Sequence, residues 1–173
     1  MRKIKKPGYI IITFVLILSF SYAFTDNGGN MVFTDVPAGH WAEESIYKLR
    51  GQGITDGIGN NKFGMGLTIN RSEFAAFLVK LMKWDLYYPD KGSYTDNLDK
   101  GKWYFSYIET ALKNDAIVKD CEIFRAEEPI SREEMAVMIV RALGYENLSV
   151  KLSDYNTFTD VGNNKGHIAI AKD

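Results

Sequence analysis

Apolar residues between positions 33 and 84 recur at the spacing of two helices with a loop between them. Ala42, Ile46 and Leu49 lie on one stripe of the first helix, which glycines at positions 51 and 53 end. Turn formers crowd residues 53–61 and predict a loop with a short extended piece near Phe63. The second helix carries an i, i+3, i+4, i+7 stripe of Phe74, Phe77, Leu78 and Leu81. The pattern predicts a helix-loop-helix unit.

A capping box precedes the second helix of this unit. The Asn70 side chain can accept a hydrogen bond from a free backbone N–H, while the Glu73 carboxylate reaches back to the N–H of the cap. Ser131 and Glu134 repeat the device later in the chain. A matching apolar stripe follows, formed by Ala136, Val140 and Leu143 and ended by Gly144. The chain therefore contains a second copy of the unit.

Other landmarks recur at the interval that separates the two capping boxes. The segment at 33–36, Phe-Thr-Asp-Val, returns in related form at 94–97 and at 158–161, which places Asp35, Asp96 and Asp160 at a nearly constant spacing. Trp103 follows Trp41 at almost the same interval, Ile108 follows Ile46, and Phe124 follows Phe63. So many coincident spacings identify a true internal repeat.

One helix pair is too small to bury a core alone, so neighbouring copies should pack on one another. We predict a mainly α fold of tandem helix-loop-helix repeats. Repeat 1 is expected at 33–84, a linker at 85–93, repeat 2 at 94–146 and the start of a truncated third repeat at 158–173.

The first 23 residues have the pattern of a secretory signal peptide. A basic start precedes an apolar run over 9–20 and the small-residue pattern Ser21-Tyr22-Ala23. The alternative is an uncleaved membrane anchor, but a helix of twelve residues spans roughly 18 Å against about 30 Å of hydrocarbon. We therefore expect cleavage after Ala23. The single cysteine, Cys121, cannot form an internal disulfide and is predicted to be a small packed residue.

Charge and candidate chemistry narrow the function. Four of the 21 basic residues lie in the first six positions, so 17 basic and 22 acidic residues remain, a net charge of −5 and a poor match for nucleic acid or anionic lipid. His40 and His167 are the only histidines, and no metal-binding spacing or phosphate-binding glycine loop occurs. Adjacent acids such as Glu133 and Glu134 point to different sides of a helix and are interpreted as solvated surface. The sequence predicts no enzyme, no cofactor and no metal.

The spaced motifs resemble a known family. Residues 33–42 read Phe-x-Asp-Val-Pro-x-x-His-Trp-Ala, then follow Gly53-Ile54-x-x-Gly57, Phe63, and Ile-x-Arg-x-Glu-Phe-Ala at 69–75. Together they resemble the S-layer homology repeat over nearly all of residues 33–173. The resemblance implies a pseudo-threefold helical bundle, with grooves between repeats that bind secondary cell-wall polysaccharide, often carrying pyruvate ketals. Repeat 2 departs from the pattern with Asp115-Ala116-Ile117 in place of the Gly-Ile turn, and the third copy has no Trp at 163–168.

Arg71 and Arg132 are the first candidates for binding that polysaccharide. Each follows a helix cap, where free N–H groups and the helix dipole favour an anion. A planar carboxylate also suits the bidentate geometry of Arg. The alternative is a structural salt bridge to an acid of the next repeat, and the two interpretations are equal from the residues alone. The family resemblance favours ligand contact.

Tryptophans and acids supply the remaining candidates. Trp41 and Trp103 are candidate polymer-binding residues because each could stack on a sugar ring, although taken alone a large aromatic at a helix start is more often a packing residue. Asp35 and Asp96 could bond sugar hydroxyls, yet such residues more often fix a turn by accepting from nearby N–H groups. Glu73 and Glu134 are expected to support the arginines.

The predicted function is non-catalytic anchoring of an exported protein at the bacterial cell wall, through secondary cell-wall polysaccharide, with the pyruvylated form as a candidate. Two alternatives come from other classes. One is a structural surface-layer protein whose repeats self-associate, and the other is the anchor fragment of a wall-active enzyme. Predicted partners are the polysaccharide and other repeats of this type, with no nucleic acid and no membrane after signal cleavage.

Overall fold

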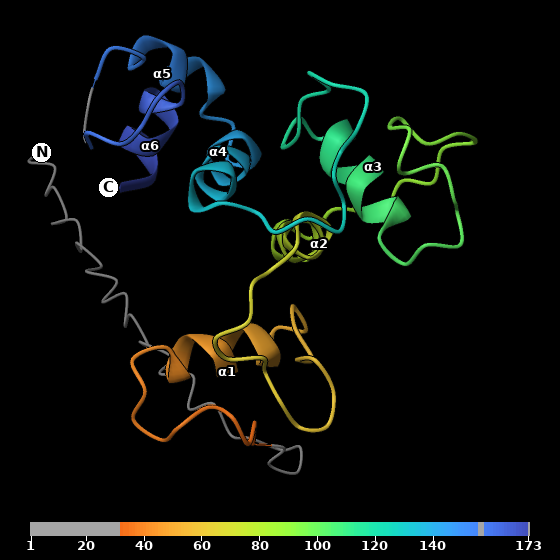
Figure 1. Cartoon of the computed structure of the whole chain (residues 1–173), viewed down its shortest axis with the longest axis vertical. Helices are drawn as coiled ribbons and strands as arrows, with labels where there is room; N and C mark the ends of the chain where they lie inside the picture. The colour runs from red at the N-terminus through yellow and green to blue at the C-terminus, as the bar shows by residue number, and fades with distance from the viewer. Residues whose placement is uncertain (1–31, 156–157, 173) are drawn as a thin grey trace, which may run out of the picture. The chain divides into compact units, whose positions relative to one another are not determined.

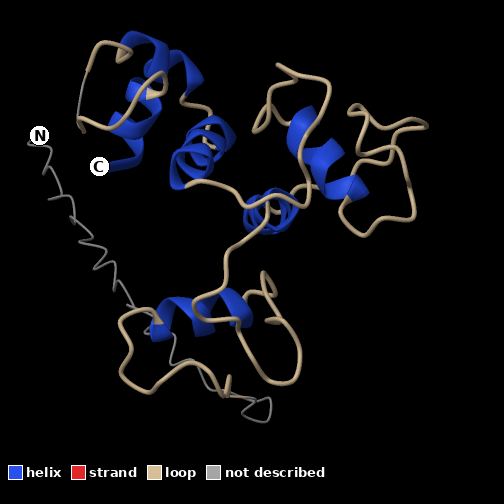
Figure 2. Cartoon of the chain, in the orientation of Figure 1, coloured by secondary structure: helices blue, strands red, loops and turns tan. Residues whose placement is uncertain are grey.

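Six helices form the regular structure of the part of the chain that the computed structural model describes, residues 32–155 and 158–172 (Figure 1). They are α1 (Glu43–Gly51), α2 (Arg71–Met82), α3 (Phe105–Lys113), α4 (Arg132–Ala142), α5 (Glu146–Lys151) and α6 (Lys165–Lys172). These residues form no strand (Figure 2). The predicted mainly α fold is confirmed, while the predicted signal peptide at 1–23 lies outside the described residues.

Capping boxes begin both second helices, as the sequence predicts. The N–H of Asn70 donates to the Glu73 carboxylate at 2.7 Å ahead of α2. Ahead of α4, the N–H of Ser131 donates to Glu134 at 2.9 Å, and the N–H of Glu134 donates to the Ser131 hydroxyl at 3.2 Å. These bonds satisfy N–H groups that the first helical turn leaves without a partner.

Helices of neighbouring repeats pack on each other. Helix α2 of repeat 1 packs against α3 of repeat 2, and α4 of repeat 2 packs against α6, which lies in the segment predicted to begin a third copy. The largest core lies between α2, α3 and the loops of repeat 2. Its fully buried members include Ala75, Val79, Ile108, Ala111 and Phe124. A separate small cluster of Phe33, Val36 and Ile46 holds α1. The packing across repeat boundaries confirms that one helix pair does not make the core alone.

The buried faces of α2 and α4 differ from the predicted stripes. Leu81 is 50% exposed and Leu143 is 53% exposed, so both predictions of burial are wrong. The face of α2 that meets α3 is centred on Ala75, Leu78 and Val79 instead. Small alanine side chains allow two helices to approach closely, and this rotates the contact away from the bulkiest residues.

Three local features also differ from expectation. Residues near Phe63 form an isolated bridge between Gly59 and Lys62, not an extended strand. Helix α5 was not anticipated by the apolar pattern. Cys121 is exposed and its thiol donates to the carbonyl of Ile123 at 3.0 Å, so the prediction of a packed cysteine is wrong. It sits in a loop where the chain has no core to bury it.

The turn after the first helix is kept in repeat 2 without its glycine. Gly53 has φ +69°, and Asp115, its counterpart in repeat 2, has φ +58°. Asp tolerates this left-handed conformation better than most residues because its short polar side chain bonds locally. The departure from the Gly-Ile pattern therefore changes the residue and not the geometry.

Candidate functional site

An aspartate ties the start of each repeat to the loop before its second helix. The Asp35 carboxylate accepts from the N–H groups of Phe63, Gly64 and Met65 at 2.7, 2.8 and 3.0 Å. Asp96 accepts from the three corresponding N–H groups, those of residues 124–126, at 2.8, 2.8 and 3.3 Å. The donors lie 28–30 residues away, so these aspartates do not cap nearby turns as predicted but join distant segments.

The same hydrogen bonds set the charge of Asp35. Burial raises the pKa of a carboxyl group, but three backbone N–H donors outweigh it and hold the pKa of Asp35 below its ordinary value. Both carboxylate oxygens are used in these bonds. The carboxylate therefore stays ionised and positions the loop.

The loop before α4 in repeat 2 is joined to the start of α2 by three backbone hydrogen bonds. The N–H of Arg71 donates to the carbonyl of Glu128 at 3.0 Å, and the N–H of Ser72 donates to that of Ala126 at 2.9 Å. The N–H of Ile130 donates back to the carbonyl of Ile69 at 3.0 Å. The expectation that free N–H groups at this helix start attract an anion is therefore wrong for α2, because the neighbouring repeat already occupies these two.

The Arg71 side chain crosses into repeat 2. Its Nε donates to the carbonyl of Phe124 at 2.8 Å, and its Nη1 forms an ion pair with Oε1 of Glu134. The guanidinium lies 4.8 Å from the centre of the Phe124 ring. The structure thus contains the salt bridge to the next repeat that the sequence left as one of two interpretations. The remaining donors of the guanidinium fork are not used in these contacts.

A second arginine, Arg125, meets the same carboxylate oxygen. Its Nη2 donates to Oε1 of Glu134 at 2.9 Å. Arg125 has φ +62°, in the left-handed region, whereas the corresponding position in repeat 1 is Gly64 with φ +99°. A non-glycine residue held there is strained, and such strain concentrates at functional sites. Sequence reasoning missed Arg125 because the other copy has glycine at that position.

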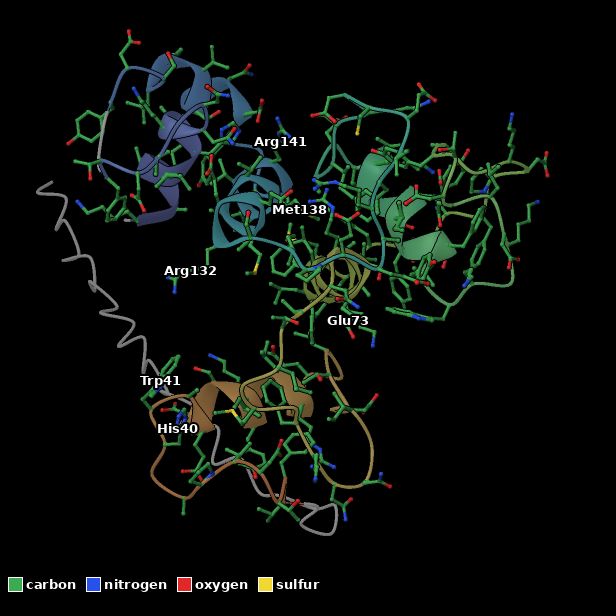
Figure 3. The ribbon with its side chains drawn as sticks, viewed as in Figure 1. His40, Trp41, Glu73, Arg132, Met138 and Arg141 are labelled. Atoms are coloured by element: carbon green, nitrogen blue, oxygen red, sulfur yellow. The ribbon has the colours of Figure 1, made fainter. Side chains whose placement is uncertain are left out.

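These residues line a groove of about 270 Å³, which we name the Arg71 groove. Arg141, at the end of α4, adds a third guanidinium, and its Nε is paired with Glu146 at 3.0 Å (Figure 3). Asp120 and Glu134 are the acids of the lining. Three arginines face two acids, so the groove is locally positive although the body of the protein is acidic.

Tyr94 also lines the Arg71 groove. Tyr94 is 2% exposed, and its hydroxyl has no hydrogen-bond partner among the described residues. Burial, with the negative charges of Cys121, Asp120 and Glu109 when ionised, raises the pKa of Tyr94 to about 12, so the hydroxyl remains a donor at neutral pH. The related segments at 33–36 and 158–161 have phenylalanine here, at positions 33 and 158. That single Tyr-for-Phe difference was the sequence signal that could have revealed it.

A second groove, of about 370 Å³, lies on repeat 1 and is named here the Trp103 groove. Residues 54–58, 63–64 and 67–69, one face of α2 and Trp103 of repeat 2 line it. Trp103 is 58% exposed and Trp41 is 89% exposed, so neither has the core packing role that was one of their two interpretations. Trp41 stands at the start of α1 beside His40 and lines neither groove (Figure 3).

Arg132 is placed differently from Arg71. It is exposed at the start of α4 and lines neither groove, and its side chain makes no hydrogen bond or ion pair within the part of the chain that the structure describes (Figure 3). The two arginines of the repeated motif are thus not brought together. Within these described residues, no cluster of histidine, cysteine or acid side chains could hold a metal, and no helix is both long and apolar enough to cross a membrane.

Comparison with known proteins identifies the repeat. The family model of the S-layer homology domain matches residues 32–75 and 94–136, half of the chain. The chain is 32% identical to S-layer protein EA1 of Bacillus anthracis over 80% of its own length, and 31% identical to Exoglucanase XynX of Acetivibrio thermocellus over 75%. It is 33% identical over 60% to the Surface layer protein of Brevibacillus choshinensis. The chain spans only 16%, 13% and 10% of these three relatives.

The chain belongs to the S-layer homology domain family. Domains of this family are non-catalytic modules that attach proteins to the cell wall, and the enzymes among the relatives match over a small fraction of their length. Membership makes this a secreted protein associated with the wall at the cell surface. The predicted family and location are therefore confirmed.

Proposed function

We propose that the Arg71 groove anchors the protein by binding an anionic unit of secondary cell-wall polysaccharide, such as a pyruvate ketal. One observation carries the proposal: Arg71 and Arg125 converge on a single carboxylate oxygen, Oε1 of Glu134. The groove is thus already built to hold a carboxylate. Guanidinium donors outside that contact remain for a second carboxylate, which a planar fork can bind bidentately.

The Tyr94 hydroxyl supports the same proposal independently. A buried hydroxyl without a partner costs free energy, so it calls for a functional explanation. Tyr94 lines a groove rich in arginine, and a small side-chain movement on ligand binding would let its hydroxyl donate to a ligand oxygen. Asp96 holds the loop, and Glu134 holds the two arginines, so both act as positioning residues for the site.

The sharpest test replaces Tyr94 with phenylalanine, the residue that the first copy uses. Tyr94→Phe should weaken binding of purified, pyruvylated wall polysaccharide about 2- to 10-fold, the loss of one neutral hydrogen bond. The melting temperature should not fall, because the hydroxyl has no partner to lose among the described residues. Calorimetric titration and a thermal melt on the same protein measure both. Tyr155→Phe, at an exposed position outside both grooves, is the control.

Arg71 gives the larger effect. Arg71→Ala should remove a charge-assisted contact worth roughly 1.5–3 kcal/mol, about 10- to 150-fold in affinity. Arg71→Lys keeps the positive charge but lacks the planar guanidinium that binds a carboxylate bidentately. Its affinity for the polysaccharide should therefore lie between those of the parent and Arg71→Ala. Lys48→Ala removes a positive charge on α1, away from the groove, and should bind like the parent. Unchanged binding in both Arg71→Ala and Tyr94→Phe would exclude this groove as the anchor site.

A further inference from the structure

The Trp103 groove repeats the acceptors that hold Arg71, but none of the described residues that line it is an arginine. In the Arg71 groove, the guanidinium meets the carbonyl and the ring of Phe124 and Oε1 of Glu134. Phe63 and Glu73 lie at the corresponding positions of repeat 1, and both line the Trp103 groove. Each acceptor of the Arg71 guanidinium therefore has a counterpart in repeat 1.

The two sets of acceptors share one backbone arrangement. In each repeat an aspartate holds the loop by three backbone N–H groups. The rings of Phe63 and Phe33 have centroids 5.7 Å apart. Those of Phe124 and Tyr94, their counterparts, are 5.4 Å apart. Phe124 is buried where Arg71 covers it, whereas Phe63 is only half-buried, as expected for a ring without a guanidinium on it.

The acceptors of repeat 1 lack the partner that those of repeat 2 have. Among the described residues, no donor meets the carbonyl of Phe63. Glu73 accepts the N–H of Asn70 with Oε2 at 2.7 Å, and its Oε1 has no partner in the same part of the chain. Glu134 divides its oxygens in the same way, with Oε2 for the N–H of Ser131 and Oε1 for the arginines. Repeat 1 thus presents the same acceptors without an arginine.

The charges of the Trp103 groove also favour a cation. Its described lining holds two acids, Asp56 and Glu73, and one basic residue, Lys80. The Lys80 ammonium is turned to a backbone carbonyl at 3.5 Å. Gly64 stands where repeat 2 has Arg125, so the second guanidinium on the carboxylate is missing as well. A planar guanidinium is the group that these unused acceptors fit.

Arg132 supplies a guanidinium that fits this site. It is the repeat counterpart of Arg71, it is exposed, and it does not line the Trp103 groove of its own chain. The backbone N–H groups of Arg132 and Glu133 also have no partner among the described residues. Those of Arg71 and Ser72 are held by carbonyls of the next repeat. The start of α4 therefore lacks the contacts that the start of α2 has.

We propose that two copies of the chain associate, with Arg132 of one copy bound in the Trp103 groove of the other. Its guanidinium pairs with Glu73 and covers the ring of Phe63. Since each copy carries both halves of this contact, a twofold dimer can form it twice. Helix α6 already packs on α4 as α3 packs on α2, so the second copy contributes the start of α4 and not the whole helix.

Sedimentation velocity at low ionic strength, over a range of protein concentrations and without polysaccharide, tests the proposal. The parent should form a concentration-dependent dimer that weakens as salt screens the ion pair. Arg132→Glu places two acids opposite each other and should lower the association constant about tenfold or more. Glu73→Gln should also weaken association, while it keeps an oxygen for the N–H of Asn70. Lys48→Glu, a charge reversal at an exposed position outside both grooves, is the matched control and should associate like the parent.

An exchange of charges between two variants identifies the pair directly. Glu73→Arg should not associate with itself, but an equimolar mixture with Arg132→Glu should recover the dimer, because each variant supplies the partner of the other's change. Thermal melts check the folds, and if Glu73→Arg melts early, Arg132→Glu and Glu73→Gln decide. A parent that stays monomeric overturns the proposal, and so does association of Arg132→Glu equal to that of the parent. Because no polysaccharide is present, neither result bears on the function proposed for the Arg71 groove.

Discussion

Glu134 illustrates how single residues connect the repeats. Its carboxylate caps α4 through Ser131 and receives Arg71 of the preceding repeat and Arg125 of its own. Burial opposes its ionisation, but the hydrogen bonds from Ser131 and the charges of the two arginines outweigh burial and lower the pKa of Glu134. The prediction that the acid pair at 133–134 is solvated surface is therefore wrong for Glu134.

This lowered pKa predicts how stability depends on pH. A carboxyl group whose pKa is depressed on folding contributes stability above its unfolded pKa and loses it as the pH falls through the folded value. The ordinary value for glutamate is 4.5, so the contribution of Glu134 should be complete at pH 7 and disappear in acid. Glu134→Gln should lower the melting temperature at pH 7 and flatten its fall between about pH 5 and pH 3.

Thermal melts of the parent and Glu134→Gln over this pH range make the measurement. The two curves should converge in acid, where the parent also loses the charge. Some pH dependence should persist in the variant, because Asp35 and Glu146 have lowered pKa values too. Glu44→Gln, at an exposed position of α1, controls for loss of charge alone. A constant offset between parent and Glu134→Gln at every pH would contradict the assignment.

At the scale of elements, the α2–α3 contact is the structural joint between repeats 1 and 2. Ile108 of α3 is fully buried there. Ile108→Ala should lower the free energy of unfolding by about 2–5 kcal/mol through lost burial and the cavity left behind. Leu81→Ala, on α2, should cost far less because Leu81 is 50% exposed. Urea unfolding measures the loss of unfolding free energy in both variants. Similar losses for Ile108→Ala and Leu81→Ala would contradict the observed buried face of α2 and favour the stripe that the sequence predicts.

The sequence predicts elements better than it predicts contacts between them. Capping boxes are local, so Asn70 and Ser131 locate α2 and α4 from the sequence alone. The buried face of α2 depends on the side chains of α3 that pack against it. The periodicity of α2 alone does not contain that information, and it therefore assigns Leu81 to the core. Arg71 was found because it lies in a repeated motif. Arg125 and Tyr94 were missed because they are differences between copies, and a search for repeats discards differences.

At the scale of the whole described unit, the segment predicted to begin a third copy is attached to α4 through α5 and α6. Nε2 of His167 lies 2.8 Å from the Glu146 carboxylate, which also pairs with Arg141 of α4. Gly166 packs directly on the backbone of Ser149. This attachment reaches the Arg71 groove, since Arg141 and Asn164 both line it. The packing of α6 thus supports one wall of the candidate site.

Gly166→Ala should loosen this attachment selectively. A β-carbon at this position would lie 1.8 Å from the carbonyl oxygen of Ser149, a backbone atom that cannot move aside without shifting α5. Amide hydrogen exchange should therefore accelerate in α5 and α6, while α2 and α3 keep the protection of the parent. Gly162→Ala is the matched control, because nothing lies within 4 Å of the added carbon. If exchange accelerates equally in α2 and α3, the described unit unfolds as a whole and the effect is not selective. If exchange in α6 is unchanged, the contact between Gly166 and Ser149 does not hold α6 in place.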